Sequence, residues 1–190
     1  MRPLDFVSSA LLVLAGAACQ DKASGAHLEA PVTTGSPAGA PAVPAALKVP
    51  EGQKPVLRAQ AKGAQVYTCS AKEGGAFAWT LKGPDAELFD AQAKPIGKHY
   101  AGPTWESADG SKVVGQVKEK ADAPDPGAIQ WLLLEAKSNA GQGVFGKVKS
   151  VQRIETRGGK APAAGCDAAH AGAETRVDYQ AAYVFYDGAG

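Results

Sequence analysis

The chain has 190 residues, enough for one ordinary domain with a short extension, and its formal net charge is +1. A charge this close to zero excludes strong electrostatic steering of nucleic acids or acidic substrates toward the protein. The sequence contains no basic block, no cysteine–histidine spacing typical of zinc sites and no aromatic RNA-binding motif. We therefore expect no nucleic-acid partner, no metal and no cofactor.

Residues 1–18 have the layout of a secretory signal, in which Arg2 precedes an apolar run over 6–14 and small residues follow up to Ala18. The run is too short for a permanent membrane span, which needs about 20 residues. A buried N-terminal helix is the alternative interpretation.

Cys19 follows these small residues directly, which resembles the lipid-attachment site of a bacterial lipoprotein signal. We predict that cleavage leaves Cys19 as the first residue and that its thiol is acylated, so that the protein reaches the membrane through a lipid anchor. Plain secretion after cleavage near Ala18 is the alternative. Gln20, in place of an aspartate, favours the outer membrane with the protein facing the periplasm if the cell is Gram-negative.

Residues 19–46 are rich in alanine, proline and glycine and show no periodic apolar face. Such a segment cannot bury enough apolar surface to offset the entropy lost on ordering. We predict a flexible tether here, followed by one folded domain over 47–187.

From Val49 onward, short apolar or alternating stretches are separated by Gly, Pro, Asn and Asp. Strands are predicted at 56–60, 64–70, 76–82, 111–117, 129–136, 145–156 and 177–186. Period-two alternation places Val177, Tyr179, Ala181, Tyr183 and Phe185 on one face of the last strand. The pattern predicts an all-β, antiparallel sandwich or barrel-like domain with long loops.

The local sequence of two segments within this region suggests structures other than strands. Residues 84–90, PDAELFD, predict one helical turn with Asp85 near its start. Residues 141–146, GQGVFG, match the dinucleotide-binding pattern G-x-G-x-x-G after an apolar run. The motif comes late in the chain and the stretch after it suits a strand as well as a helix, so we predict a glycine-rich hairpin loop instead.

Cys69 and Cys166 remain as an even pair if Cys19 is acylated, and an exported protein meets an oxidising compartment. We predict a disulfide between them that pins the irregular segment around Cys166 to a strand. The alternative is a thiol nucleophile at Cys166 with His170 nearby in sequence.

The stretch HYAGPTWESADGSKVVG contains a hairpin signal at Asp109-Gly110, because both positions tolerate positive φ. The hairpin would pair residues 103–106 with 111–117 and would explain Asp109 by backbone geometry alone.

Polar and aromatic side chains gather beside this hairpin, and the candidate binding surface is His99, Tyr100, Trp105 and Glu106. Trp79 and Trp131 lie inside apolar runs and are predicted to be core residues. Trp105 lies between polar residues and is predicted to be partly exposed, available to stack on a ligand.

Long stretches of the folded part carry a family resemblance. They are VPEGQKPVLRAQAKGAQVYTC, FAWTLKGPDAELFD, GKHYAGPTWESADGSKVVG, IQWLLLEA, GVFGKVKSVQRIETRGGKAP and the GC that precedes a final YVFY. Over about Val49 to Tyr186 the chain resembles domain-of-unknown-function family 3455, whose members are exported bacterial and fungal proteins; HYAGPTWE…DGS is the most specific piece. The resemblance supports the domain boundary and the pairing of Cys69 with Cys166. It implies no activity, and the malate dehydrogenase label of some fungal relatives finds no support here beyond the isolated glycine motif.

We expect a non-catalytic envelope module that binds a glycan, a small ligand or a protein. One alternative is a hydrolase that acts on an envelope polymer through His99 and Glu106, although no recognised nucleophile or metal motif accompanies them. Another is a purely structural envelope protein. An exposed Trp105 would favour binding, a cleft that brings His99 to a carboxylate or hydroxyl would favour the enzyme, and burial of both residues would favour the structural alternative.

Overall fold

The structure is a computed structural model, and it describes residues 42–188. The predicted signal at 1–18, the lipid-attachment residue Cys19 and most of the predicted tether lie outside the described residues. Within 42–188, no helix is long and apolar enough to cross a membrane.

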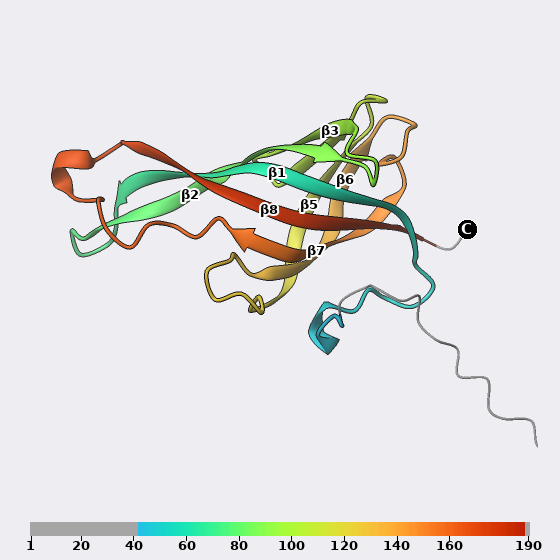
Figure 1. The fold of residues 1–190 in the computed structure, drawn as a ribbon, viewed down its shortest axis with the longest axis horizontal. Coiled ribbons are helices and arrows are strands. Elements are labelled where there is room, and N and C mark those ends of the chain that lie inside the picture. Colours follow the sequence, from blue (N-terminus) through green and yellow to red (C-terminus); the bar gives the residue numbers. More distant parts are fainter. Residues whose placement is uncertain (1–41, 189–190) are drawn as a thin grey trace, which may run out of the picture. The chain divides into compact units, whose positions relative to one another are not determined.

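The described residues form eight antiparallel strands that follow one another around a closed barrel, in which β8 pairs with β1 (Figure 1). The strands are β1 (Lys54–Ala71), β2 (Phe77–Phe89), β3 (Pro95–Tyr100), β4 (Thr104–Ser107), β5 (Lys112–Ala121), β6 (Trp131–Ala140), β7 (Val148–Gly158) and β8 (Glu174–Asp187). Within the barrel itself, closure gives every strand a neighbour on both sides. The prediction of an antiparallel all-β domain is confirmed, and of the two architectures left open the chain adopts the barrel.

Alternation along the strands builds the barrel interior. On β8, Tyr179, Ala181, Tyr183 and Phe185 are all at most 2% exposed and pack in one apolar cluster, as period two predicts. Phe145, from the β6–β7 loop, packs against Phe185 with ring centroids 4.5 Å apart. Phe145 and Phe185 thus fill the end of the barrel at this loop.

A second apolar cluster lies on the opposite face of the same strands, formed by the residues that alternate with the interior ones: Trp131, Leu133, Ile154, Ala182 and Val184. A short N-terminal segment covers it with the 3-10 turn η1 (Ala45–Leu47), whose Leu47 is fully buried. Gln152 fixes this cover, because its Nε2 donates to the carbonyl of Leu47 at 2.6 Å.

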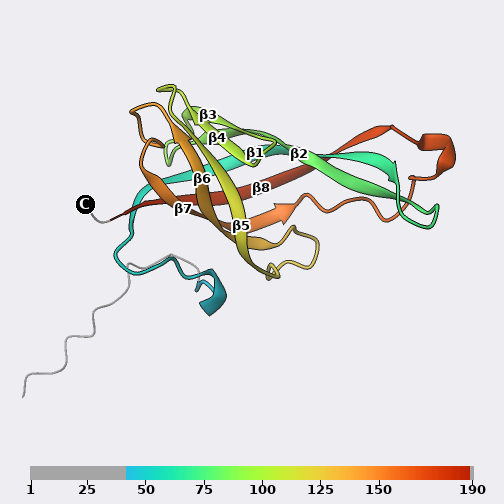
Figure 2. The same ribbon diagram turned by 180° about the vertical axis from the view of Figure 1, so that it is seen from behind.

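Three strands are longer than the barrel needs. β1, β2 and β8 continue past the other strands toward the end where the short turn η2 (Ala168–His170) lies (Figure 1 and Figure 2). Cys69 on β1 is bonded there to Cys166, which is 97 positions away in the β7–β8 loop. The predicted disulfide is confirmed and the thiol-nucleophile alternative is wrong, because both sulfur atoms are in the bond. A disulfide of this kind favours a compartment outside the cytoplasm.

The predicted helical turn at 84–90 is wrong. Residues 84–89 continue β2, which pairs there with β1 on one side and β3 on the other. Ala86 and Leu88 point into the core, and the Asp85 carboxylate binds Arg176 at 2.8 Å instead of capping a turn. Strand pairing on both sides therefore outweighs the local helical signal.

Both predicted hairpin loops are confirmed. Gly110, at φ 83°, turns the chain between β4 and β5, and residues 141–146 join antiparallel β6 and β7 with no helix after them. Asp109 ties the two loops together: it accepts hydrogen bonds from the backbone N–H of Ser111 at 2.8 Å and of Val144 at 2.9 Å. The hydrogen bonds from Ser111 and Val144 lower the pKa of Asp109 to about 2.

Candidate functional site: a cavity inside the barrel

A cavity of about 300 Å³ lies inside the barrel, and each of the strands β1 to β8 contributes to its wall. Barrels of this strand number are just wide enough to be filled by side chains or to hold one small ligand. The lining residues that carry the chemistry are Gln65, His99, Trp105, Leu132, Arg153 and Tyr183.

Much of the wall is apolar. Leu132 and Leu134 on β6 form one side, and Leu81 on β2 and Val117 on β5 also line the cavity. Leu81 and Val117 are 52% and 49% exposed, which makes them two of the few large apolar side chains in residues 42–188 that face solvent to that degree. We infer that they form the rim of the cavity, where it meets solvent.

His99 and Trp105 form a stacked pair at the wall. They are opposite one another on β3 and β4, with parallel rings whose centroids are 4.5 Å apart, and Tyr183 meets both rings edge-on. Trp105 also contacts Phe185. The stack thus separates the cavity from the aromatic side chains that fill the end of the barrel.

Burial fixes the protonation state of His99. Its pKa is lowered to about 3, first because burial penalises the charged form, so the ring is neutral at physiological pH. Nδ1 lies 2.8 Å from the carbonyl oxygen of Thr104. A carbonyl can only accept, so Nδ1 carries the proton and Nε2 is left as a hydrogen-bond acceptor.

Several buried polar atoms of the wall lack a partner within the described part of the chain. They are Gln65 Nε2, Trp105 Nε1 and the hydroxyl of Tyr183, each on a side chain at most 2% exposed. Buried polar atoms are nearly always paired, and leaving one unpaired costs about 1–3 kcal/mol. Three of the unpartnered atoms in residues 42–188 belong to residues of this one cavity, and the other three, on Gln53, Trp131 and Tyr179, do not line it.

Arg153 brings a positive charge to this wall. Its Nε and Nη2 both donate to the carbonyl of Gln130, at 3.0 and 2.9 Å, which fixes the guanidinium on β7. Burial raises the pKa of Tyr183, and the charge of Arg153 opposes that rise. The same charge adds to the lowering of the His99 pKa. Arg153, His99 and Tyr183 all line the same cavity.

The four residues predicted as one binding surface divide between two faces of the sheet. His99 and Trp105 point into the barrel and line the cavity. Tyr100 and Glu106 lie on the other face, where the Tyr100 hydroxyl donates to Glu106 at 2.8 Å. Lys112 pairs with the same carboxylate at 3.2 Å. Hydrogen bonds from Tyr100 and then from Lys112 lower the pKa of Glu106.

The predictions for the tryptophans had mixed outcomes. Trp105 is 1% exposed, so the prediction of partial exposure is wrong. Trp131 is buried as predicted, although on the outer cluster under η1. Trp79 is only half-buried, on the strand extension, and donates from Nε1 to the carbonyl of Ala164 at 2.9 Å. An apolar run therefore identified the strand of Trp79 but not its burial.

Sequence reasoning did not single out Gln65, Arg153 and Tyr183 as site residues. Arg153 carried the clearest signal. It lies two positions after Val151 in the predicted strand 145–156, so both side chains are expected on the same face of that strand. A charged residue on a core face is unusual and marks either a paired charge or a binding site.

Comparison with known proteins gives one match. The family described as Protein of unknown function (DUF3455) matches residues 50–187, a range that includes every strand, both bonded cysteines and the whole lining of the cavity. No curated protein and no solved structure matches the chain. The match covers well over half of the sequence, and the chain therefore belongs to the DUF3455 family of proteins of unknown function.

Proposed function

We propose that this domain binds a small organic molecule inside its barrel. The observation that carries the proposal is the cavity with unpartnered buried atoms on Gln65, Trp105 and Tyr183. Ligand sites of proteins are typically concave and mostly apolar with a few placed polar groups, and their volumes begin at about 300 Å³. The wall of this cavity is likewise mostly apolar, with a few polar side chains among the leucines and aromatic residues.

The alternatives are supported less well. Burial of His99 and Trp105 by itself would suit a purely structural protein, but both side chains line a cavity with an apolar rim. The hydrolase hypothesis pairs His99 with Glu106, and these residues lie on opposite faces of the sheet. A glycan or protein bound on the outer surface would leave the unpartnered interior atoms without a role.

We further propose that the protein is exported and anchored to a membrane of the cell envelope through an acylated Cys19, which is the outer membrane if the cell is Gram-negative. The Cys69–Cys166 disulfide supports export, and the lipoprotein-type signal supports acylation. The proposal predicts that protein extracted from membranes has an N-terminal Cys19 carrying acyl chains, as measured by intact mass. Recovery of an unacylated chain from the soluble fraction would contradict it.

Ligand binding is tested by blocking the rim of the cavity. In Val117→Trp the larger side chain occupies the opening, and because the native residue is 49% exposed the fold should tolerate it. We expect the full-length wild type to bind 2-naphthalenemethanol or 2-naphthoate saturably in calorimetric titration. Val117→Trp should weaken that binding tenfold or more.

The matched control is Val56→Trp, the same change at a valine of β1 that is 44% exposed and does not line the cavity. It should leave the affinity within twofold of wild type. The proposal fails if neither naphthalene compound binds, or if both tryptophan variants bind as the wild type does.

A further inference from the structure

We propose that the ligand of this cavity is a small organic anion, a carboxylate attached to an apolar body, and that Arg153 binds its charged end. This inference rests on the proposed function and names the chemical class of its ligand.

Arg153 has binding capacity that the described protein groups do not use. A guanidinium has five N–H donors, and two of its nitrogens donate to the carbonyl of Gln130. Within residues 42–188, Arg153 forms no ion pair, whereas Arg58 and Arg176, two of its fellow arginines, each bind a carboxylate. The hydroxyl of Tyr183 also lies within reach of this guanidinium, which leaves about two of its five N–H donors for an occupant of the cavity.

The electrostatics of the wall favour an anion. The cavity lining contains no aspartate or glutamate, and its other cation, Lys82, is already paired with Glu174 at 2.6 Å. A half-buried guanidinium without a counter-charge is unfavourable, because burial removes water that stabilises the charge. A ligand carboxylate would supply the missing counter-charge, and its two oxygens fit the fork of a guanidinium.

The other unpartnered groups match the same ligand. Gln65 Nε2 and Trp105 Nε1 are donors only, and the Tyr183 hydroxyl can donate as well. His99 Nε2 is an acceptor in the same wall, but donors outnumber it, and a wall in which donors predominate is complementary to the acceptor oxygens of a carboxylate. Leu81, Leu132 and Leu134 then offer apolar contact to the rest of the molecule.

A matched pair of probes isolates the charge. 2-Naphthoate and 2-naphthalenemethanol share their ring system and differ mainly in the negative charge. We expect the full-length wild type to bind the carboxylate at least tenfold more tightly than the alcohol at pH 7. In Arg153→Gln this preference should fall below twofold, with the affinity for the alcohol changed less than threefold.

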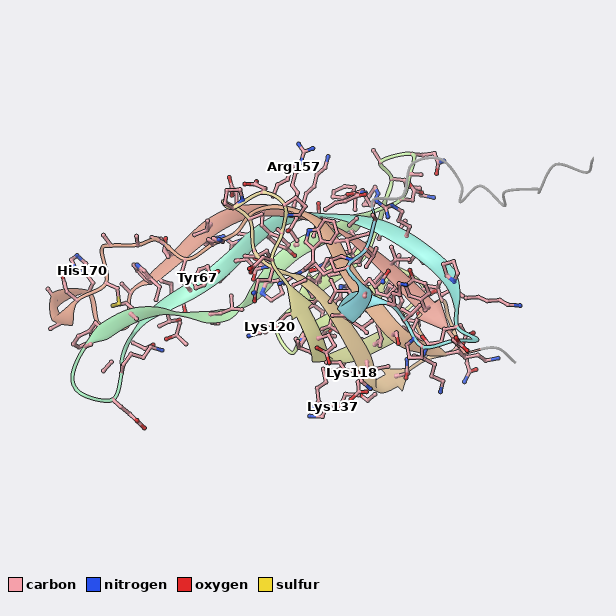
Figure 3. The ribbon with its side chains drawn as sticks, turned by 90° about the horizontal axis from the view of Figure 1, so that it is seen from below. Tyr67, Lys118, Lys120, Lys137, Arg157 and His170 are labelled. Atoms are coloured by element: carbon pink, nitrogen blue, oxygen red, sulfur yellow. A yellow bond between two sulfur atoms is a disulfide. The ribbon has the colours of Figure 1, made fainter. Side chains whose placement is uncertain are left out.

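Arg157→Gln is the control for a general loss of positive charge. Arg157 is on the same strand, is exposed and points away from the barrel (Figure 3), and its variant should keep the wild-type preference. Arg153→Lys keeps the positive charge but loses the planar guanidinium, and it should retain part of the preference for the carboxylate over the alcohol.

The outcomes separate the two proposals. If neither probe binds, the proposed function fails and this inference fails with it. If both probes bind the wild type with equal affinity, the cavity is a binding site but not one for anions, and only this inference is overturned. The wild-type comparison decides this even if Arg153→Gln does not fold. A preference for the carboxylate that survives unchanged in a folded Arg153→Gln would also overturn the role of Arg153.

Discussion

His99 illustrates how its surroundings decide what a single side chain can do. The ring is stacked on Trp105, fully enclosed and held by the carbonyl of Thr104, so its pKa falls from 6.5 to about 3. It therefore serves as a neutral acceptor in the cavity wall at physiological pH.

This pKa predicts a pH dependence of stability. His99 in the unfolded chain takes up a proton as pH falls below about 6.5, whereas the folded protein binds it only near pH 3. The unfolded state thus binds more protons in this window. As the pH is lowered through it, His99 therefore decreases the free energy of unfolding, by up to about 1.4 kcal/mol per pH unit. Urea unfolding at pH 7.5 and at pH 4.5 should show that the free energy of unfolding decreases less between these two values for His99→Gln than for the wild type.

His170→Gln is the matched control, because His170 is exposed on η2. Its free energy of unfolding should decrease between pH 7.5 and pH 4.5 by much the same amount as that of the wild type. Equal declines in all three proteins would show that His99 titrates normally and is not enclosed as described.

At this scale the sequence predicted His99 and Trp105, which both line the cavity, as binding residues, but it did not predict the groups opposite them. Sequence proximity grouped His99 and Trp105 with Tyr100 and Glu106, although neighbouring residues of a strand point to opposite faces. Arg153 and Tyr183 lie more than 45 positions away and meet the cavity only after the barrel has closed. A motif in one stretch of sequence cannot show such a meeting.

At the scale of elements, η1 shows that the domain uses both faces of its sheet. Leu47 packs with Trp131, Leu133 and Ile154 on the outside of the barrel. The tyrosine hydroxyl of Tyr186 donates to Gln152, whose amide in turn holds the Leu47 carbonyl.

This packing predicts that Leu47→Ala lowers the free energy of unfolding by about 2–5 kcal/mol, as removal of a buried leucine side chain does. Lys48→Ala, at an exposed neighbouring position, should change it by less than about 0.5 kcal/mol. Chemical denaturation measures both. A loss for Leu47→Ala no larger than that for Lys48→Ala would mean that η1 does not cover the barrel.

Elements were more predictable than residues. Turn chemistry located the Asp109-Gly110 hairpin, because glycine tolerates the positive φ found there. Alternation located β8 and its buried face. The segment 84–90 was misassigned because its local sequence suits a helical turn, and its pairing with β1 and β3 depends on residues elsewhere in the chain.

At the scale of the molecule, closure of the eight-stranded sheet into a barrel encloses an internal cavity. Side chains from Phe145 and Phe185 fill one end, and the cavity occupies the interior beyond Trp105. Strand alternation is the same in a sandwich and in a barrel, so the sequence predicted the all-β class but left closure, and with it the cavity, undetermined.

Binding inside the barrel is tested most directly at the indole of Trp105, by NMR of protein labelled with ¹⁵N at its tryptophans. On titration with 2-naphthoate, the Trp105 Nε1–H signal should shift, because Trp105 lines the cavity and its Nε1 has no protein partner in residues 42–188. The signals of Trp79, bonded to Ala164, and of Trp131, on the outer cluster, should stay in place. A saturable shift confined to Trp79 or Trp131, or no shift at any tryptophan, would contradict a ligand site inside the barrel.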